Sequence, residues 1–261
     1  MRTFLTLFKH EWKLSIRNMN MVIFAILMPL VVLVILGFLY GAEPVIPNAG
    51  SSFPGSSFPR SASAGFSYLA QSFGPLCGIS ICAGGFMGLP LVVSDYRERK
   101  LLKRFQVTPA SPVLLLAVQF SIDVLYAAIS LLTLIPAARF WNVPMSGLGP
   151  AFFGSWLLTL VSSLSIGMMV GGIAKNPQQA SVIACLLYFP MLLFSGATLP
   201  FEVLPEAVQN LSGIFPMTQG LQLMKAAFLG LPAEDGTAAV LGMAALSFIC
   251  FGISIRFFRW E

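Results

Sequence analysis

Long stretches without a charged residue decide what this chain can fold into. Five of them have 20 residues or more: Asn18–Ala42, Ser61–Ser94, Trp141–Ala174, Asn176–Phe201 and Gly236–Ile255. A sixth apolar run, at 112–138, is interrupted only by Asp123. The apolar core of a bilayer is about 30 Å thick, and an α-helix of about 20 apolar residues crosses it. The sequence therefore predicts an all-α integral membrane protein with six transmembrane helices.

We expect these spans at about 21–40, 67–92, 112–137, 151–174, 179–199 and 238–256, within one transmembrane domain that covers residues 1–261. A count of seven would add 207–224 as a span. That segment contains Gly213, Pro216 and Gly220, which favour short helices over one long helix. We therefore expect 200–224 to form an extracellular re-entrant segment of short helices between spans five and six.

The composition excludes most other classes of protein. Hydrophobic residues make up 57% of the chain and charged residues 10%, whereas soluble domains have about 25% charged residues. So few charged side chains do not cover the surface of a soluble protein of this size. An ordinary cytosolic enzyme, a nucleic-acid-binding domain and a disordered chain are therefore excluded.

The positions of lysine and arginine predict the orientation. In the six-span arrangement twelve of the 15 Lys and Arg residues fall on one side, and Arg60, Arg139 and Lys225 fall on the other. Positive residues are enriched on the cytoplasmic side of membrane proteins. Both termini are therefore expected in the cytoplasm. The polar loop at 41–65, with its tandem Gly-Ser-Ser-Phe-Pro repeat, is expected outside and flexible.

Residues 2–17 have the pattern of an amphipathic helix. At 100° per residue, Phe4, Leu7, Phe8, Trp12 and Leu14 fall largely on one side. The other side carries Arg2, Thr6, Lys9, His10, Lys13 and Arg17. A helix of this kind lies in the membrane interface with its cations toward anionic lipid headgroups. We predict an interfacial helix here, although a basic leader that only sets the topology would have the same charges.

The motifs of membrane enzymes and of ATP-driven motors are missing. No Gly-Lys pair occurs, so the chain lacks a phosphate-binding P-loop. The single histidine, His10, begins a His-Glu-x-x sequence that lacks the second zinc-binding histidine. The four cysteines, at 77, 82, 185 and 250, have spacings that match no metal site. We expect no catalytic residue, no metal and no cofactor in this chain.

A basic segment follows the second expected span. Five cations fall within the eight residues 97–104, and helix-forming residues run from 95 to 106 before Pro109. Leu101, Leu102 and Phe105 share one face of such a helix. A short amphipathic helix on the cytoplasmic side can dock into a groove of a soluble partner. Anchoring to anionic lipid would explain the same charges.

Two segments together resemble a known family. The first is Arg97-Glu-Arg-Lys…Leu-Lys-Arg-Phe…Thr-Pro109, and the second is Ser195-Gly…Pro200…Leu204-Pro205-Glu…Phe215-Pro216…Gln219…Leu223. In order and spacing they are similar to the signatures that permeases of the ABC type-2 exporter family carry after the second and fifth spans. The resemblance covers nearly the whole chain.

The resemblance implies a partnership with a motor. Two permease subunits, identical or different, would form a dimer in the plasma (inner) membrane, and a cytoplasmic ABC ATPase subunit that binds ATP and Mg²⁺ would dock on each. The coupling helix at 95–106 would present the residues Arg97, Glu98, Arg99, Lys100, Leu101, Leu102, Lys103, Arg104 and Phe105. An outer gate would include Gly196, Pro200, Pro205, Glu206 and Pro216.

Glycine spacing and one buried charge point to the interior of the bundle. Gly84 and Gly88 in the second span, and Gly167 and Gly171 in the fourth, have the GxxxG spacing that lets helices approach closely in lipid. They pack either within the chain or between subunits. Asp123 lies within a span, where a carboxylate costs about 2.5–3.5 kcal/mol and must face protein or water. It is either a contact for the transported molecule or an internal hydrogen-bond partner.

The resemblance implies a permease of an ATP-driven exporter, which would act by drug or antibiotic efflux or by lipid or glycolipid export. The apolar spans and sparse charge favour a hydrophobic or amphipathic substrate. An ion-gradient-driven transporter would need more ionisable groups in its spans than Asp123 alone. A non-transporting membrane subunit is the third alternative. An ATPase that co-purifies with the chain distinguishes the first from the second.

Cysteine labelling tests the predicted orientation. In a chain whose four native cysteines are replaced by alanine, we expect a membrane-impermeant maleimide to label Ser56→Cys on intact cells. Lys100→Cys should react only after the membrane is permeabilised, because the segment after the second span is expected in the cytoplasm. Labelling of Lys100→Cys on intact cells would reverse the orientation.

Overall fold

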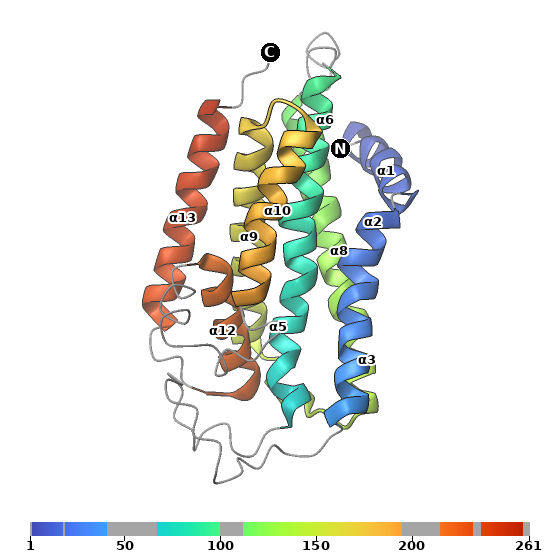
Figure 1. Ribbon diagram of the computed structural model, residues 1–261, viewed down its shortest axis with the longest axis vertical. Helices are drawn as coiled ribbons and strands as arrows, with labels where there is room; N and C mark the ends of the chain where they lie inside the picture. Colours follow the sequence, from blue (N-terminus) through green and yellow to red (C-terminus); the bar gives the residue numbers. More distant parts are fainter. Residues whose placement is uncertain are drawn as a thin grey trace.

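The computed structural model describes residues 2–17, 19–40, 67–99, 112–194, 215–231 and 236–257, and in these ranges the chain forms a helical bundle (Figure 1). The α-helices are α1 (Arg2–Arg17), α2 (Met19–Val22), α3 (Met28–Tyr40), α5 (Tyr68–Cys82), α6 (Leu89–Glu98), α8 (Pro112–Phe140), α9 (Pro150–Ile173), α10 (Pro177–Phe194), α12 (Pro216–Leu229) and α13 (Gly236–Phe257). Two π-helical segments, η1 (Ile23–Leu27) and η2 (Ala83–Gly88), and a 3₁₀ turn, η3 (Met145–Gly147), complete the described elements.

Each expected span forms helix over nearly all of its described residues. Four helices are long and apolar enough to cross a membrane: Tyr68–Glu98, Leu114–Phe140, Pro150–Ile173 and Gly236–Ser254. A fifth apolar helix, Ile23–Leu39, is shorter. The all-helical membrane class is therefore confirmed for the described residues, while the count of six spans and their orientation stay predictions. The second helix runs on to Glu98, six residues past its expected end, because residues 93–98 contain no helix breaker.

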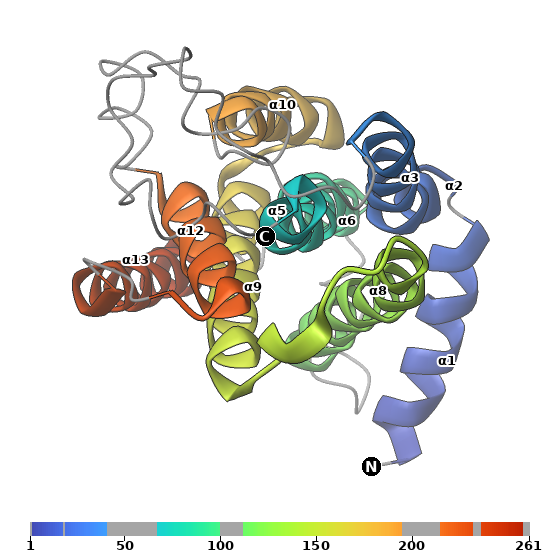
Figure 2. The same ribbon diagram turned by 90° about the horizontal axis from the view of Figure 1, so that it is seen from below.

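The helix formed by α5, η2 and α6 is the centre of the bundle. Seen along the bundle, α3, α8, α9 and α10 surround it, whereas α13 lies at the edge (Figure 2). Burial agrees with this arrangement, since 83% of the central helix's most apolar window is buried and 17% of that of α13. Large apolar side chains such as Phe38 on α3, Leu186 on α10 and Phe248 on α13 are exposed. They offer surface to lipid or to a second subunit.

Both π-helical segments end just before a proline. The ring of a proline inside a helix clashes with the carbonyl four residues earlier, and proline has no N–H to donate. η1 is followed by Pro29 and η2 by Pro90. In each, the preceding amide donates five residues back, from Met28 to Ile23 and from Leu89 to Gly84. A π turn thus absorbs the proline, whereas the α-helices continue through Pro75, Pro136 and Pro190.

Glycine lets the central helix touch its neighbours backbone to backbone. A methyl group on Gly167 of α9 would overlap the carbonyl oxygen of Gly85, and one on Gly85 would overlap Ser163. A Cβ on Gly171 would lie 2.9 Å from that of Val93. A Cβ on Gly84 would contact Asp123 of α8, and one on Gly88 would overlap Met21 of α2. All of these contacts lie within the chain.

α12 is a short helix at the end of the bundle opposite α1 (Figure 1). It packs against α5, α9 and α13 and buries nine residues, among them Met217, Leu221 and Met224. Pro216 is its first residue, and Gly230 ends it in the left-handed conformation with φ of 69°. The preceding part of the expected re-entrant segment, 200–214, and the loop at 41–65 lie outside the described residues.

The backbone contact at Gly167 predicts a position-specific loss of stability. Gly167→Ala should lower the free energy of unfolding by about 1–3 kcal/mol, because the added methyl group forces α9 away from the central helix. Gly154→Ala is the matched control on α9, since a Cβ there meets no atom within 4 Å. Unfolding in detergent, followed by tryptophan fluorescence, compares them. Equal stability of the two variants would contradict the close packing.

Candidate functional site

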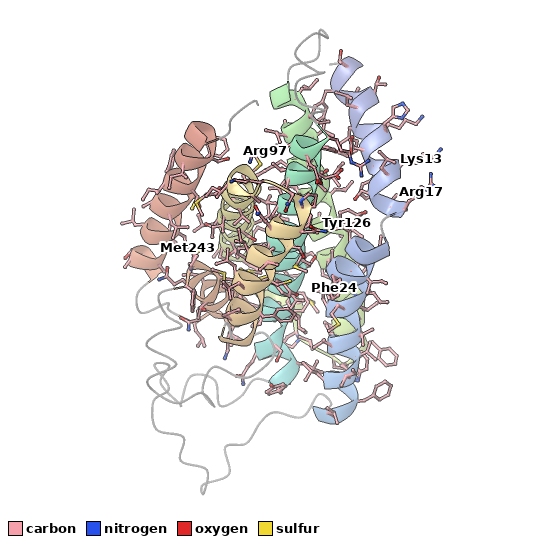
Figure 3. All side chains as sticks on the ribbon, turned by 45° about the horizontal axis from the view of Figure 1, so that its top comes forward. Lys13, Arg17, Phe24, Arg97, Tyr126 and Met243 are labelled. Carbon is pink, nitrogen blue, oxygen red and sulfur yellow. The ribbon has the colours of Figure 1, made fainter. Side chains whose placement is uncertain are left out.

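Positive side chains gather at the α1 end of the bundle, which is also where α6 and α13 end (Figure 1). Lys9, Lys13 and Arg17 of α1 are exposed, and Lys13 and Arg17 extend away from the bundle (Figure 3). Arg139 and Lys225 lie on α8 and α12 toward the other end. The asymmetry is the one expected of a cytoplasmic α1 end.

The helix predicted over residues 2–17 is present as α1 with those bounds. Phe4, Leu7, Phe8 and Trp12 pack against the cluster that contains Tyr126 of α8, and the Trp12 and Tyr126 rings lie 5.2 Å apart. Leu14 differs from the sequence expectation, because it is 59% exposed and does not belong to this packed face. The aromatic side chains thus attach α1 along the outside of the bundle (Figure 2).

Two hydrogen bonds connect α1 to the helices that it covers. Tyr96 near the end of α6 donates to Glu11 over 2.7 Å, and Ser15 donates to the hydroxyl of Tyr126 on α8 over 3.0 Å. Tyr96 comes directly before the basic segment that starts at Arg97, so this bond connects α1 to the residue next to that segment. The sequence pattern does not reveal this contact.

Arg97 lies against the C-terminal end of α9. Its Nη1 donates to the carbonyl oxygens of Gly171, Gly172 and Ala174, the last over 2.9 Å. The final carbonyl groups of a helix have no partner within it, and a cation there is stabilised by the helix dipole. Arg97, which the sequence assigns to the coupling segment, therefore also links the end of α6 to α9.

The other residues of the expected coupling helix are described only in part. Glu98 is exposed at the last position of α6, and Arg99 donates to Asp95 over 2.8 Å. The hydrogen bond and the charge of Asp95 raise the pKa of Arg99 above its ordinary value. Lys100, Leu101, Leu102, Lys103, Arg104 and Phe105 lie outside the described residues. So do four of the residues assigned to the outer gate: Gly196, Pro200, Pro205 and Glu206.

Asp123 lies on α8 at the point where the two π-helical segments meet. It is 3% exposed, and neither carboxylate oxygen has a hydrogen-bond partner in the described part of the chain. The carboxamide of Gln119, one turn earlier, is near enough to interact but does not reach hydrogen-bond geometry. A Cβ on Gly88 would lie 3.4 Å from Oδ1 of Asp123, and one on Gly84 would lie 3.6 Å from its Cβ. These are ordinary contact distances, so Asp123 packs beside the two glycines, and the side chain that a Cβ on Gly88 would overlap is Met21.

A cavity of about 360 Å³ lies between α1 and the bundle. Its polar lining consists of Glu11 and Ser15 from α1, Asp95 and Tyr96 from α6, and Gln119 from α8. Met21 contributes an apolar wall next to Gly88 and Asp123. Asp123 does not itself line the cavity, but its neighbours Met21 and Gln119 do.

No group of three or more His, Cys, Asp or Glu side chains within the described ranges could hold a metal ion. The cysteines at 77, 82, 185 and 250 are free thiols. The described elements thus bring together two features: an end at which α1, α6 and α9 are joined by hydrogen bonds and aromatic packing, and a buried carboxylate near a cavity.

A family model for the ABC-2 type transporter matches residues 2–229. The match covers most of the chain, including α1, the central helix and α12. The chain belongs to the ABC-2 type transporter family, which confirms the resemblance inferred from its two signature segments.

Three curated relatives match parts of the chain. The chain is 27% identical over 166 residues to the inner membrane transport permease YhhJ of Escherichia coli, and the matched stretch covers 62% of this chain and 44% of YhhJ. It is 24% identical over 141 residues to the probable multidrug ABC transporter permease YbhR of Escherichia coli, with 53% and 38% covered. It is 28% identical over 102 residues to nodulation protein J of Neorhizobium galegae, with 39% of each covered. The matched stretches thus span less than half the length of these relatives.

Removal of the Arg97 side chain should loosen the end of α9. We expect Arg97→Ala to lower the free energy of unfolding by about 1–2 kcal/mol. Hydrogen bonds of charged groups contribute up to about 3 kcal/mol, and less is expected here because the guanidinium is partly exposed to solvent. Amide hydrogen exchange at residues 171–174 should become faster.

Arg99→Ala is the control, because it removes the same charge from a side chain that is 67% exposed and pairs with Asp95. Exchange at the end of α9 that stays unchanged in Arg97→Ala, or that rises as much in Arg99→Ala, would contradict the capping role.

Proposed function

We propose that this chain is the membrane-spanning permease subunit of an ATP-driven exporter in the inner membrane. A separate cytoplasmic ATPase would bind ATP and Mg²⁺ and dock on the segment that follows α6. The family match supports this assignment, as do the missing P-loop and the relatives that are described as transport permeases.

The continuity of the central helix is the observation that carries the proposal. From the glycine contacts in the middle of the bundle this helix runs to Glu98, directly before the remainder of the basic segment. At that end Tyr96 bonds to α1 and Arg97 to α9. Force that the ATPase applies to 95–106 would therefore reach α1, α9 and the interior together. The bundle would rock as closely packed helices and open at the α12 end.

The proposed substrate is hydrophobic or amphipathic. The helices of the bundle carry mainly apolar side chains. Within the described spans, and away from their ends, the charged residue is Asp123. YbhR is described as a multidrug permease, which supports efflux of such molecules. Two permease subunits, identical or different, would enclose the path, with lipid around the exposed faces of α3, α10 and α13.

Substitution in the docking segment tests the partnership. Leu101→Asp combined with Phe105→Asp should abolish co-purification of the ATPase, because two charges on the apolar face prevent it from entering a groove. Insertion into the membrane should be unchanged. Affinity purification from membranes, followed by quantification of the ATPase band, measures the effect.

Phe53→Asp combined with Phe58→Asp is the matched control, since it makes the same kind of change in the loop expected outside. This control should retain a stoichiometric ATPase. An ATPase that stays bound to the Leu101→Asp, Phe105→Asp chain would contradict the assignment of the docking segment. If no ATPase co-purifies with the unsubstituted chain, the proposed function itself is wrong.

A further inference from the structure

The cavity between α1 and the bundle has a charge that differs from its surroundings. The α1 end carries exposed Lys9, Lys13 and Arg17, yet no lysine or arginine of the described ranges lines the cavity. Its ionisable lining consists of Glu11, Asp95 and Tyr96. Asp95 pairs with Arg99 over 2.8 Å, whereas Glu11 accepts a hydrogen bond from the neutral phenol of Tyr96 and keeps its charge. An anionic molecule would be repelled by the Glu11 carboxylate, whereas a cation would be attracted.

The rest of the lining fits an apolar body attached to such a cation. Leu14, Leu91 and Val92 contribute aliphatic surface, and the ring of Tyr96 can stabilise a cation placed over its face. A volume of about 360 Å³ lies within the range of small-molecule sites, about 300–1,000 Å³. The position beside an interfacial helix puts the cavity at the depth where amphiphiles gather in a bilayer.

A second observation, independent of the acidic lining, points to a cationic ligand. Asp123 is 3% exposed, and both of its oxygens are unpartnered. It shares a face of α8 with Gln119, which lines the cavity. Met21, the other side chain between them, is unbranched and adopts other rotamers readily. The carboxylate therefore lies directly behind the inner wall of the cavity, where a ligand's positive charge would supply the missing partner.

We propose that this exporter carries amphiphilic organic cations, which bind in the cavity between α1 and α6 and then place their charge against Asp123. Glu11 and Asp95 form the outer, solvated contact, and Asp123 forms the inner, desolvated contact. The inference rests on the proposed export function, whose substrate class it narrows.

Two probes of the same shape and opposite charge test the proposal. The full chain is placed in nanodiscs of zwitterionic lipid, and binding of radiolabelled tetraphenylphosphonium is compared with binding of tetraphenylborate. We expect saturable binding of the cation and none of the anion. Asp123→Asn, and separately Glu11→Gln with Asp95→Asn, should each weaken cation binding at least about tenfold, which corresponds to about 1.4 kcal/mol.

Two controls separate charge from folding. Ser130→Ala removes another buried, unpartnered polar group from α8 and should bind the cation normally. Asp123→Glu keeps the charge and should retain most of the binding. Equal cation affinity in Asp123→Asn and the unsubstituted chain would overturn the proposal, as would saturable binding of tetraphenylborate.

The assay contains no ATPase, so a failed docking proposal would leave the binding results unchanged. The assembled complex provides the second arm, in which ATP-dependent export of tetraphenylphosphonium should fall in Asp123→Asn. Binding without export by a complex that hydrolyses ATP would overturn the assignment of the substrate class, while an ATPase that never associates would overturn the exporter itself.

Discussion

Close approach of helix backbones at glycine is the constraint on which the rest of this structure depends. In lipid, helices gain little from hiding apolar side chains from water, so association relies on packing and on polar contacts. Gly85 of the central helix and Gly167 of α9 touch through backbone atoms, and Gly171 lies against Val93. These contacts let one helix be enclosed by α3, α8, α9 and α10. The same helix extends to the proposed docking segment, so packing in the interior and coupling at the end share one element.

The π turns and Asp123 belong to the same region. A proline in a span requires a local change in backbone hydrogen bonding, and here both changes take the form of π turns that meet beside α8. π turns occur frequently at functional sites. The Asp123 carboxylate lies beside Gly84 and Gly88 of η2, and its burial costs about 2.5–3.5 kcal/mol. A cost of this size without a compensating hydrogen bond is expected where a group serves a ligand and not the fold.

The sequence predicts the helices well and the contacts between them poorly. Charge-free runs place α8 and α9 within about three residues, since apolar length is set by the bilayer and not by packing. The π turns do not follow from Pro29 and Pro90, because an α-helix can also continue through a proline without a π turn, as at Pro75. The role of Arg97 at α9 depends on how α6 and α9 lie side by side, because Arg97 and the carbonyl groups that it binds are 74 or more residues apart in the sequence. Glu11 and Gln119 carry no motif, so the cavity that they line emerges only from the fold.

A distance measured at the α12 end tests the central claim most directly, namely that a separate motor moves this bundle from its α1 end. Spin labels are attached to Phe140→Cys of α8 and Leu241→Cys of α13, since both positions are exposed. Double electron–electron resonance then measures the distance between the two labels, and so between two sides of the bundle. We expect the distance distribution to shift when ATP is trapped in the assembled complex, and to remain unchanged when ATP is added to the purified chain alone. A shift in the chain alone, or an unchanged distribution in an assembled complex that hydrolyses ATP, would contradict the central claim.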